Sequence, residues 1–246
     1  MKPAMEKLFA GGVAVLVAGL LVLGVAGLDR PVHAAAAAPA AEVPAPSGIA
    51  DLRQPGVHRA RVVFAGGCFW GVQGVFQHVK GVDSAVSGYI GGSGADARYP
   101  RVSAGNTGHA EAVQVTYDPS RVSYAQLMQV FFSVVHDPTQ RDRQGPDRGS
   151  QYRSAVYADD AAQRAATLAY IDQLQRSGVF AAPLATRVDG GKPFYPAEDY
   201  HQNYLALHPD AAYIRFYDLP KIEALKRQYP ALYRDAPRLV MPVSVR

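Results

Sequence analysis

The single cysteine of the chain, Cys68, lies two residues before its single tryptophan, Trp70, in the sequence Gly-Gly-Cys-Phe-Trp-Gly. Residues 61–64 are typical of a short strand and the apolar spacing after Cys68 of a helix, so the thiol is expected at a helix N-terminus. The free N–H groups and the dipole there favour a thiolate, the nucleophilic form of cysteine. The position therefore predicts a reactive Cys68, although free cysteines are more often buried and inert.

The residues after the cysteine, Phe69 and Trp70, suit an apolar pocket for a small uncharged group such as a methyl. On composition alone they are equally typical of core aromatics. The two interpretations are compatible, because a pocket wall can also pack on the core.

Glu111 is the second residue with predicted chemistry. In a strand beginning at Ala110, residues 111, 113, 115 and 117 share one face, and the last three are Val, Val and Tyr. A carboxyl group that heads an apolar face is partly desolvated, which raises its pKa and keeps it protonated near neutral pH. Glu111 is therefore a candidate general acid, unless the strand end is solvated and the residue is an ordinary surface charge.

Three further residues lie on or next to predicted loops. Tyr99 and Tyr152 are candidate hydroxyl donors, and Asp147 is a candidate supporting carboxylate. Residue pattern alone does not single out these tyrosines, because the chain contains 14 of them.

The histidines offer a different chemistry. A Cys–His hydrolase or acyltransferase would pair Cys68 with His109, His136 or His201, which are far apart in the sequence. A non-catalytic surface-binding module on an Ala/Pro stalk is a second alternative. Since the histidines lack compact ligand spacing and the chain has one cysteine, neither a metal site nor an internal disulfide is expected.

The elements that position these residues mix strands and helices. Strands are expected at 61–64, 82–90, 111–117, 152–157 and 185–188. Two helices are expected from Cys68 to Val79 and from a Ser123/Gln126 capping box to Val134. A third helix has Ala165, Leu168, Ile171 and Leu174 on one face and ends at Gly178, and a fourth spans 198–207. Two strands alternate polar with apolar residues, which favours an α+β sheet with helices on one face.

The first part of the chain is typical of an export segment. Residues 1–34 combine basic residues with an uncharged run from Leu8 to Leu28, which fits a cleaved signal peptide or a membrane anchor. Residues 35–56 are an Ala/Pro-rich linker, 57–208 the expected catalytic domain and 209–246 a C-terminal extension. The net charge of +4 includes no dense Lys/Arg run, so nucleic-acid binding is not expected.

Several motifs together resemble peptide methionine sulfoxide reductases of the A type. They are GCFWG at 67–71, YIGG at 89–92, GHAEAV at 108–113, YDP at 117–119, RQGPD at 143–147, GSQYR at 149–153, FYPAED at 194–199 and YHQNY at 200–204. The resemblance covers about residues 60–208.

The resemblance implies a two-layer α/β roll on a ferredoxin-like mixed β-sheet and reduction of methionine S-sulfoxide, free or in proteins. Cys68 would be the nucleophile, which becomes a sulfenic acid, and Glu111 the acid. By the same resemblance Tyr99, Tyr152 and Asp147 complete the polar side, and Phe69 with Trp70 hold the methyl group.

Family members that carry a second, resolving cysteine have it where Ser103 stands here or near the C-terminus, and this chain has neither. No bound cofactor or metal is expected. The sulfenic acid must meet an external thiol, from a thioredoxin-like protein, a glutaredoxin or a small thiol. We expect an exported or periplasmic monomer whose partner is an exported thiol reductase, with membrane contact only through the N-terminal segment.

Overall fold

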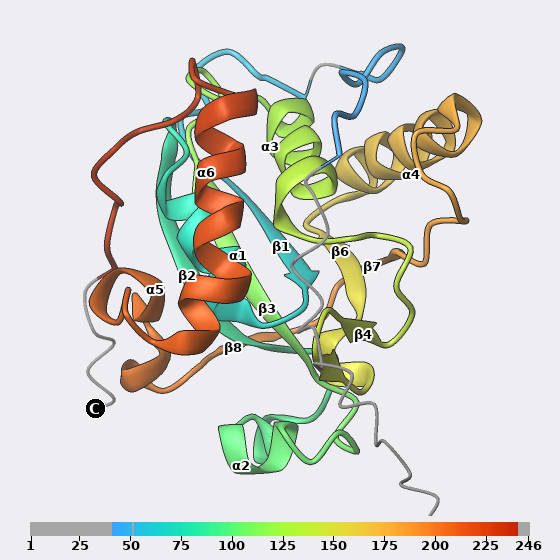
Figure 1. Ribbon diagram of the computed structural model, residues 1–246. Helices are drawn as coiled ribbons and strands as arrows, with labels where there is room; N and C mark the ends of the chain where they lie inside the picture. The colour runs from blue at the N-terminus through green and yellow to red at the C-terminus, as the bar shows by residue number, and fades with distance from the viewer. Residues whose placement is uncertain (1–40, 51, 241–246) are drawn as a thin grey trace, which may run out of the picture. The chain divides into compact units, whose positions relative to one another are not determined.

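A computed structural model describes residues 41–50 and 52–240 of the chain (Figure 1). Its centre is a curled, mixed sheet of order β7-β6-β1-β3-β2-β8, in which only the β6–β7 pair is parallel. The strands are β1 (Ala60–Gly66), β2 (Val82–Ile90), β3 (Ala110–Tyr117), β6 (Ser154–Ala158), β7 (Arg187–Gly190) and β8 (Phe194–Pro196). A small hairpin, β4 (Arg143–Gln144) and β5 (Asp147–Arg148), stands apart from this sheet.

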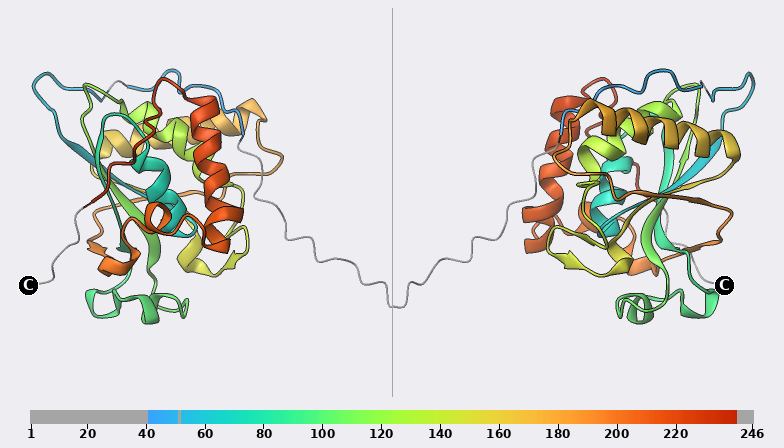
Figure 2. Two further views of the ribbon diagram at one scale, coloured as in Figure 1. Left: turned by 60° about the vertical axis from the view of Figure 1, so that its left-hand side comes forward. Right: turned by 90° about the vertical axis from the view of Figure 1, so that its right-hand side faces the viewer.

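The helices are α1 (Phe69–Gln77), α2 (Tyr99–Val102), α3 (Tyr124–Val130), α4 (Ala161–Ser177), α5 (Tyr204–Leu207) and α6 (Leu219–Gln228). Helix α1 packs on β2 and β3 and is covered in turn by α5 and α6 (Figures 1 and 2). Two π-helical turns continue the longer helices: Phe131–Val135 follows α3, and Ile214–Asp218 leads into α6. The predicted sheet with helices on one face is confirmed, with α6 as a further layer outside α1.

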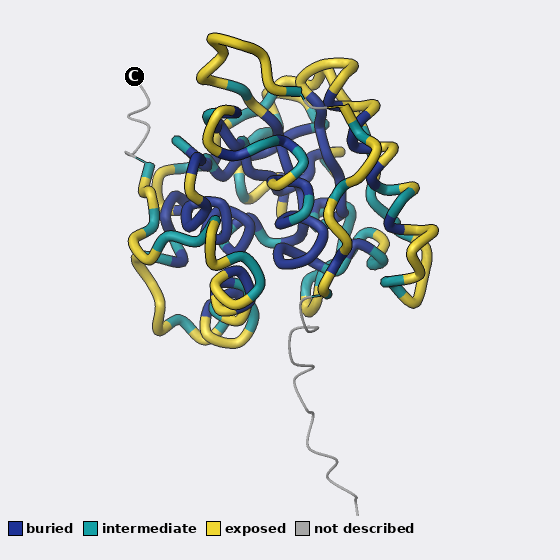
Figure 3. Tube along the Cα trace, turned by 90° about the horizontal axis from the view of Figure 1, so that it is seen from above, coloured by how far each residue is buried: buried dark blue, intermediate teal, exposed yellow. Residues whose placement is uncertain are grey.

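Side-chain alternation along β1 shows how the sheet divides the core. Val62 and Phe64 join the large cluster under the helices, whereas Val63 and Ala65 join a smaller cluster on the opposite face. Buried segments fill the centre of the molecule, and exposed segments surround it (Figure 3). The large cluster therefore fixes α1, and with it the position of Cys68.

The predicted face of the helix over residues 165–174 is only half correct: Leu174 is buried and Ile171 packs on the large cluster, but the first two predicted positions are not buried. Ala165 and Leu168 lie on the solvent side, while Thr167 and Tyr170 are buried. The Thr167 hydroxyl shares a hydrogen bond of 2.7 Å with the hydroxyl of Tyr124, and the Tyr170 hydroxyl donates to a backbone carbonyl of the N-terminal segment. Polar atoms that are satisfied in this way can face the core, which an apolar pattern does not reveal.

The continuous helix predicted for residues 198–207 is also wrong. The chain forms a 3-10 turn, Asp199–His201, and then α5, with Asn203 between them at φ 60°. The Gln202 side chain accepts a hydrogen bond from the Ser87 backbone N–H, so it is directed into the sheet rather than along a helix face. Strand β8 and the β4–β5 hairpin were not predicted, because they are short and lie in segments rich in turn residues.

The packed unit extends beyond the expected catalytic domain at both ends. Ile214 and Leu225, which follow the expected boundary at residue 208, are fully buried in the large cluster. Val43 belongs to the same cluster, and its carbonyl accepts a hydrogen bond from Gln129. Residues 209–240 are therefore part of the folded unit rather than an appendage, and part of the expected linker packs on it.

The signal peptide or anchor expected at residues 1–34 lies outside the described residues. Within the part of the chain that the structure describes, none of the helices has the length and apolar character needed to cross a bilayer.

Candidate active site

A tight turn between β1 and α1 presents Cys68. Gly67 has φ 93°, a conformation that disfavours a side chain, and a Cβ placed there would lie 2.6 Å from the Gln144 side chain. The chain then enters α1 at Phe69, with Cys68 as the partly exposed residue just before the helix. The predicted position of the thiol at a helix N-terminus is confirmed.

Glu111 lies beside this turn. It is 2% exposed, and its carboxyl Oε2 accepts a hydrogen bond of 3.1 Å from the backbone N–H of Phe69. Val113 and Val115 share its face of β3 and lie in the large cluster, as the strand pattern predicted. Burial raises the pKa of Glu111 to about 8, against a smaller opposing effect of the Phe69 hydrogen bond. At neutral pH Glu111 is therefore a proton donor next to Cys68.

The surroundings of Cys68 oppose the thiolate that its position at a helix start favours. Burial raises the pKa of the Cys68 thiol well above its ordinary value, and the carboxyl groups of Glu111, Asp218 and Asp147 raise it further. The backbone N–H of Trp70 opposes this shift, as expected at a helix start, but is outweighed. Desolvation is the largest of these effects on the pKa, and the nearby acidic groups add to it.

An aromatic cluster lies at the start of α1. Phe69 is 1% exposed and Trp70 is half-buried, with Tyr204 stacked on Trp70 at a centroid distance of 3.8 Å. The Trp70 indole N–H donates to Nδ1 of His201, and the His201 ring also lies 4.5 Å from that of Tyr99. Tyr204 was not predicted as a site residue, although it is the last residue of the motif YHQNY at 200–204.

The structure brings the predicted polar residues to the same site. The pKa values of the Tyr99 and Tyr152 hydroxyls are raised by burial and then by the charge of Glu111, and both hydroxyls also interact electrostatically with Cys68. The pKa of Asp147 is raised by burial, although the hydroxyl of Tyr213 donates to its Oδ2 at 2.5 Å. Tyr213 was missed, because it lies beyond residue 208 in a stretch without a recognisable motif.

A second acidic residue near Cys68 was also missed. Asp218 is fully buried, and its Oδ1 accepts a hydrogen bond from Lys221 Nζ at 3.0 Å. Its charge faces Cys68 and Asp147. Nothing in the local sequence signals this position, since Asp218 reaches the site only through the packing of α6 on α1.

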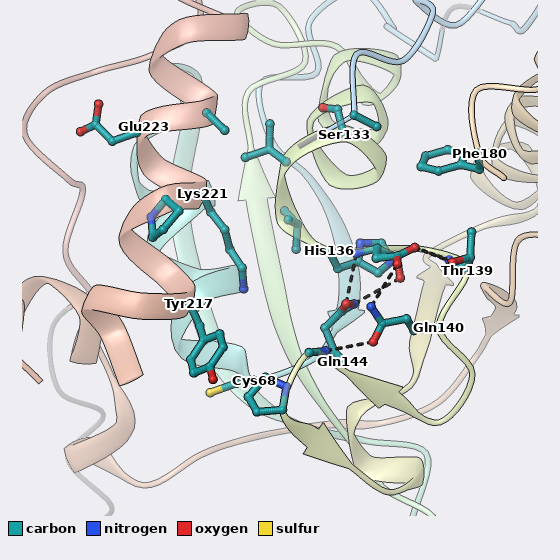
Figure 4. A pocket seen from close by; sticks show the side chains of 18 of the residues that line it. Cys68, Ser133, His136, Thr139, Gln140, Gln144, Phe180, Tyr217, Lys221 and Glu223 are labelled. Atoms are coloured by element: carbon teal, nitrogen blue, oxygen red, sulfur yellow. Dashed lines mark hydrogen bonds between the residues drawn. The ribbon is translucent and has the colours of Figure 1, made fainter. Parts of the chain in front are cut away.

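A groove of about 660 Å³ opens on Cys68 between α6 and the turn that follows α3 (Figure 4). Its lining includes Cys68, Tyr217 and Lys221 but none of the residues of the aromatic cluster. The Lys221 side chain extends from α6 toward the Cys68 end of this groove (Figure 4). Cys68 therefore lines a groove whose walls do not include the aromatic cluster.

The histidines do not form a Cys–His pair in the described residues. His109 and His136 use both ring nitrogens in hydrogen bonds to other groups, and His201 uses Nδ1 for Trp70. Among the described residues no hydrogen bond joins Cys68 to one of these histidines, as the hydrolase alternative would require. Among residues 41–50 and 52–240, no cluster of three or more His, Cys, Asp or Glu side chains is arranged to hold a metal ion.

Comparison with known proteins agrees with this geometry. The family described as Peptide methionine sulfoxide reductase matches residues 60–232. The curated relative Peptide methionine sulfoxide reductase MsrA 2 of Mesorhizobium japonicum is 57% identical over 182 residues, which cover 74% of this chain and 93% of the relative.

Two solved structures share the fold. Methionine sulfoxide reductase A of Corynebacterium diphtheriae has a TM-score of 0.54 at 32% identity, covering 70% of this chain and 87% of its own. Mxr1 from Saccharomyces cerevisiae in reduced form has a TM-score of 0.58 at 30% identity, covering 65% of this chain and 91% of its own. The α/β roll implied by the motifs is confirmed, and the chain belongs to the peptide methionine sulfoxide reductase family, in its A type.

Proposed function

We propose that the chain reduces methionine S-sulfoxide, free or within proteins, with Cys68 as nucleophile and Glu111 as proton donor. One observation carries the assignment: a buried carboxyl group with a pKa of about 8 is hydrogen-bonded to the N–H of Phe69, the residue that follows Cys68. A sulfoxide oxygen is a poor leaving group unless it is protonated, and Glu111 is still protonated at neutral pH.

The residues divide the reaction among them. Sγ of Cys68 attacks the sulfoxide sulfur while Glu111 protonates the oxygen, and the hydroxyls of Tyr99 and Tyr152 donate to the same oxygen. The protonated oxygen then passes to Sγ: an Sγ–O bond forms, the substrate's sulfur–oxygen bond and the transient sulfur–sulfur bond break, and methionine leaves with Cys68 as a sulfenic acid. The thiol supplies the two electrons, and its proton replaces the one that Glu111 gave up.

The aromatic cluster orients the substrate. Phe69 and Trp70 offer an apolar surface to the sulfoxide methyl group, and Tyr204 and His201 fix the Trp70 ring. Asp147, held by Tyr213, completes the polar wall. Because the methyl and the oxygen face opposite walls, the arrangement favours one sulfoxide epimer.

Reduction of the sulfenic acid back to the Cys68 thiol requires two external thiols, because the chain has no second cysteine. The first condenses with the sulfenic acid to give a mixed disulfide and water. The second releases Cys68 and leaves as a disulfide with the first. We propose that an exported thiol reductase or a small thiol supplies these equivalents, and that residues 1–34 direct the chain to the periplasm or cell envelope.

The reductase assignment is tested with a peptide carrying each sulfoxide epimer and dithiothreitol as the thiol. We expect methionine from the S epimer only, no product with Cys68→Ser, and a rate at least about 100-fold lower with Glu111→Gln. Product formation that survives Cys68→Ser would refute the assignment.

The source of the reducing thiols and the cellular location of the protein need separate measurements. Without added thiol, we expect one methionine per chain and a sulfenic acid that reacts with dimedone. N-terminal sequencing of the protein from cell-envelope fractions tests removal of residues 1–34. Fast turnover with a cytosolic thioredoxin, or a cytosolic location, would contradict the proposed exported partner.

A further inference from the structure

Asp218 is a buried charged group for which the proposed reaction has no use. It ends the π-helical turn Ile214–Asp218, and its side chain is fully buried. Oδ1 accepts a hydrogen bond from Lys221, whereas Oδ2 has no hydrogen-bond partner within the described residues. A half-satisfied buried carboxylate costs stability, so packing alone does not explain its presence.

The position of Asp218 explains which group it acts on. A Cβ placed on Gly71 would lie only 2.1 Å from Oδ1, so the carboxylate is in close contact with the first turn of α1. Cys68 immediately precedes that turn, and the charge of Asp218 acts on its thiol more strongly than that of Asp147. The contact requires glycine at residue 71, which means that α1 is shaped to receive this carboxylate.

The other groups around Sγ come from several elements. Glu111 lies on β3 and Asp147 on β5, and the hydroxyls of Tyr99, Tyr152 and Tyr213 complete the surroundings. All of these groups are neutral or negative.

Lys221 supplies positive charge at this end of the groove (Figure 4). Its side chain is 15% exposed and lies between the buried Asp218 and the groove. The pair thus lies against the first turn of α1, with Lys221 lining the groove that reaches Cys68.

We propose that Asp218 and Lys221 form a positioning pair that sets how readily Sγ of Cys68 reacts before a sulfoxide is bound. Asp218 disfavours a free thiolate, and Lys221 limits that effect. The inference rests on the proposed function, because an unoccupied thiolate in a one-cysteine enzyme is exposed to oxidants with no internal thiol to rescue it. Asp218 also favours the positive charge that protonation of the oxygen creates on the sulfoxide sulfur.

Alkylation of Cys68 by iodoacetamide, followed from pH 6 to 10 on the full chain without sulfoxide, tests the pair. Asp218→Asn removes the negative charge and leaves Lys221, so alkylation at pH 8 should rise about three- to tenfold. Lys221→Gln removes the positive charge from the pair, so alkylation should fall about threefold. A purely structural role would loosen the site in both variants and change the rate in the same direction.

Matched controls complete the experiment. Lys221→Arg keeps the charge and should keep the wild-type profile. Asp172→Asn breaks a comparable pair with Arg176 on exposed α4 and should change nothing. Fluorescence of Trp70 reports folding. If Asp218→Asn does not fold, the alkylation profiles of Lys221→Gln and Lys221→Arg decide between the proposed pair and a purely structural role.

Shifts in the same direction for Asp218→Asn and Lys221→Gln, or no shift, would overturn the proposal. Alkylation needs no sulfoxide, so a failure of the pair is distinguishable from a failure of the reductase assignment, which rests on product formation.

Discussion

Replacement of Glu111 by glutamine should abolish most of the activity and at the same time stabilise the fold. In the folded chain the pKa of Glu111 is about 8, against an ordinary value of 4.5, because the carboxyl is buried. Ionisation therefore favours the unfolded chain, and stability is lost as the pH rises from 4.5 through 8. The cost is about 3 kcal/mol at pH 7 and about 5 kcal/mol above pH 8, as an upper bound.

Glutamine keeps the shape of the side chain and an oxygen that can accept from Phe69, but it does not ionise. The Glu111→Gln variant should therefore gain stability over wild type at pH 7 and more at pH 8.5, with no gain near pH 4.5. For a domain of this size, about 3 kcal/mol corresponds to roughly 6–12 °C in Tm. Urea unfolding at the three pH values measures the gain directly.

Glu198 provides the matched control. Its carboxylate accepts hydrogen bonds from the Tyr99 N–H and the Tyr89 hydroxyl, and hydrogen bonds of this kind lower the pKa of Glu198 despite a burial effect in the opposite direction. Glu198→Gln should therefore destabilise the fold at pH 7 and not at low pH. If Glu111→Gln gives no gain, or a gain that does not grow with pH, then Glu111 is not a desolvated neutral acid and the proposed proton donor is lost.

Three other substitutions test the construction of the site. Gly67→Ala should cost about 1–3 kcal/mol of folding free energy in urea titrations, because φ is 93° and the new Cβ meets Gln144. Tyr204→Leu should raise KM about fivefold by loss of about 1 kcal/mol of stacking on Trp70, while Tyr204→Phe should not; an equal effect of both would contradict the stacking argument. Asn203→Ala should lower Tm, because alanine is strained in the left-handed backbone conformation at residue 203 and cannot make the three hydrogen bonds of the Asn203 side chain. An unchanged Tm would contradict this.

Local pattern was sufficient for the two elements that carry the main reacting groups. The apolar spacing after Cys68 predicted α1, and the alternation around Glu111 predicted β3 and the buried position of its carboxyl. Both predictions depend on periodicity within about ten residues. The roles of Tyr99, Tyr152 and Asp147 came from the family motifs, since their surroundings are irregular turns.

Long-range packing decided what the pattern could not show. The helix dipole at Cys68 predicted a thiolate, but the sum of charges at the sulfur includes Asp147 and Asp218, which reach it from distant segments. Likewise the polar face of α4 is buried because Tyr170 finds a hydrogen-bond acceptor in the N-terminal segment. Asp147 and Asp218 lie more than 75 residues from Cys68 in the sequence, and Pro44 lies as far from Tyr170.

The enclosure of the site raises the pKa values of both Glu111 and Cys68. A neutral Glu111 requires exclusion of water, and the same exclusion makes Cys68 reluctant to ionise, so burial alone gives an acid without a nucleophile. A bound sulfoxide resolves this conflict, because its oxygen takes the proton of Glu111 while the thiol proton replaces it, and no isolated charge is left in the site. Segment 209–240 strengthens the coupling, since it adds Asp218 and Lys221 at the start of α1. We therefore propose that the Cys68 thiol becomes reactive when the substrate completes the proton transfer.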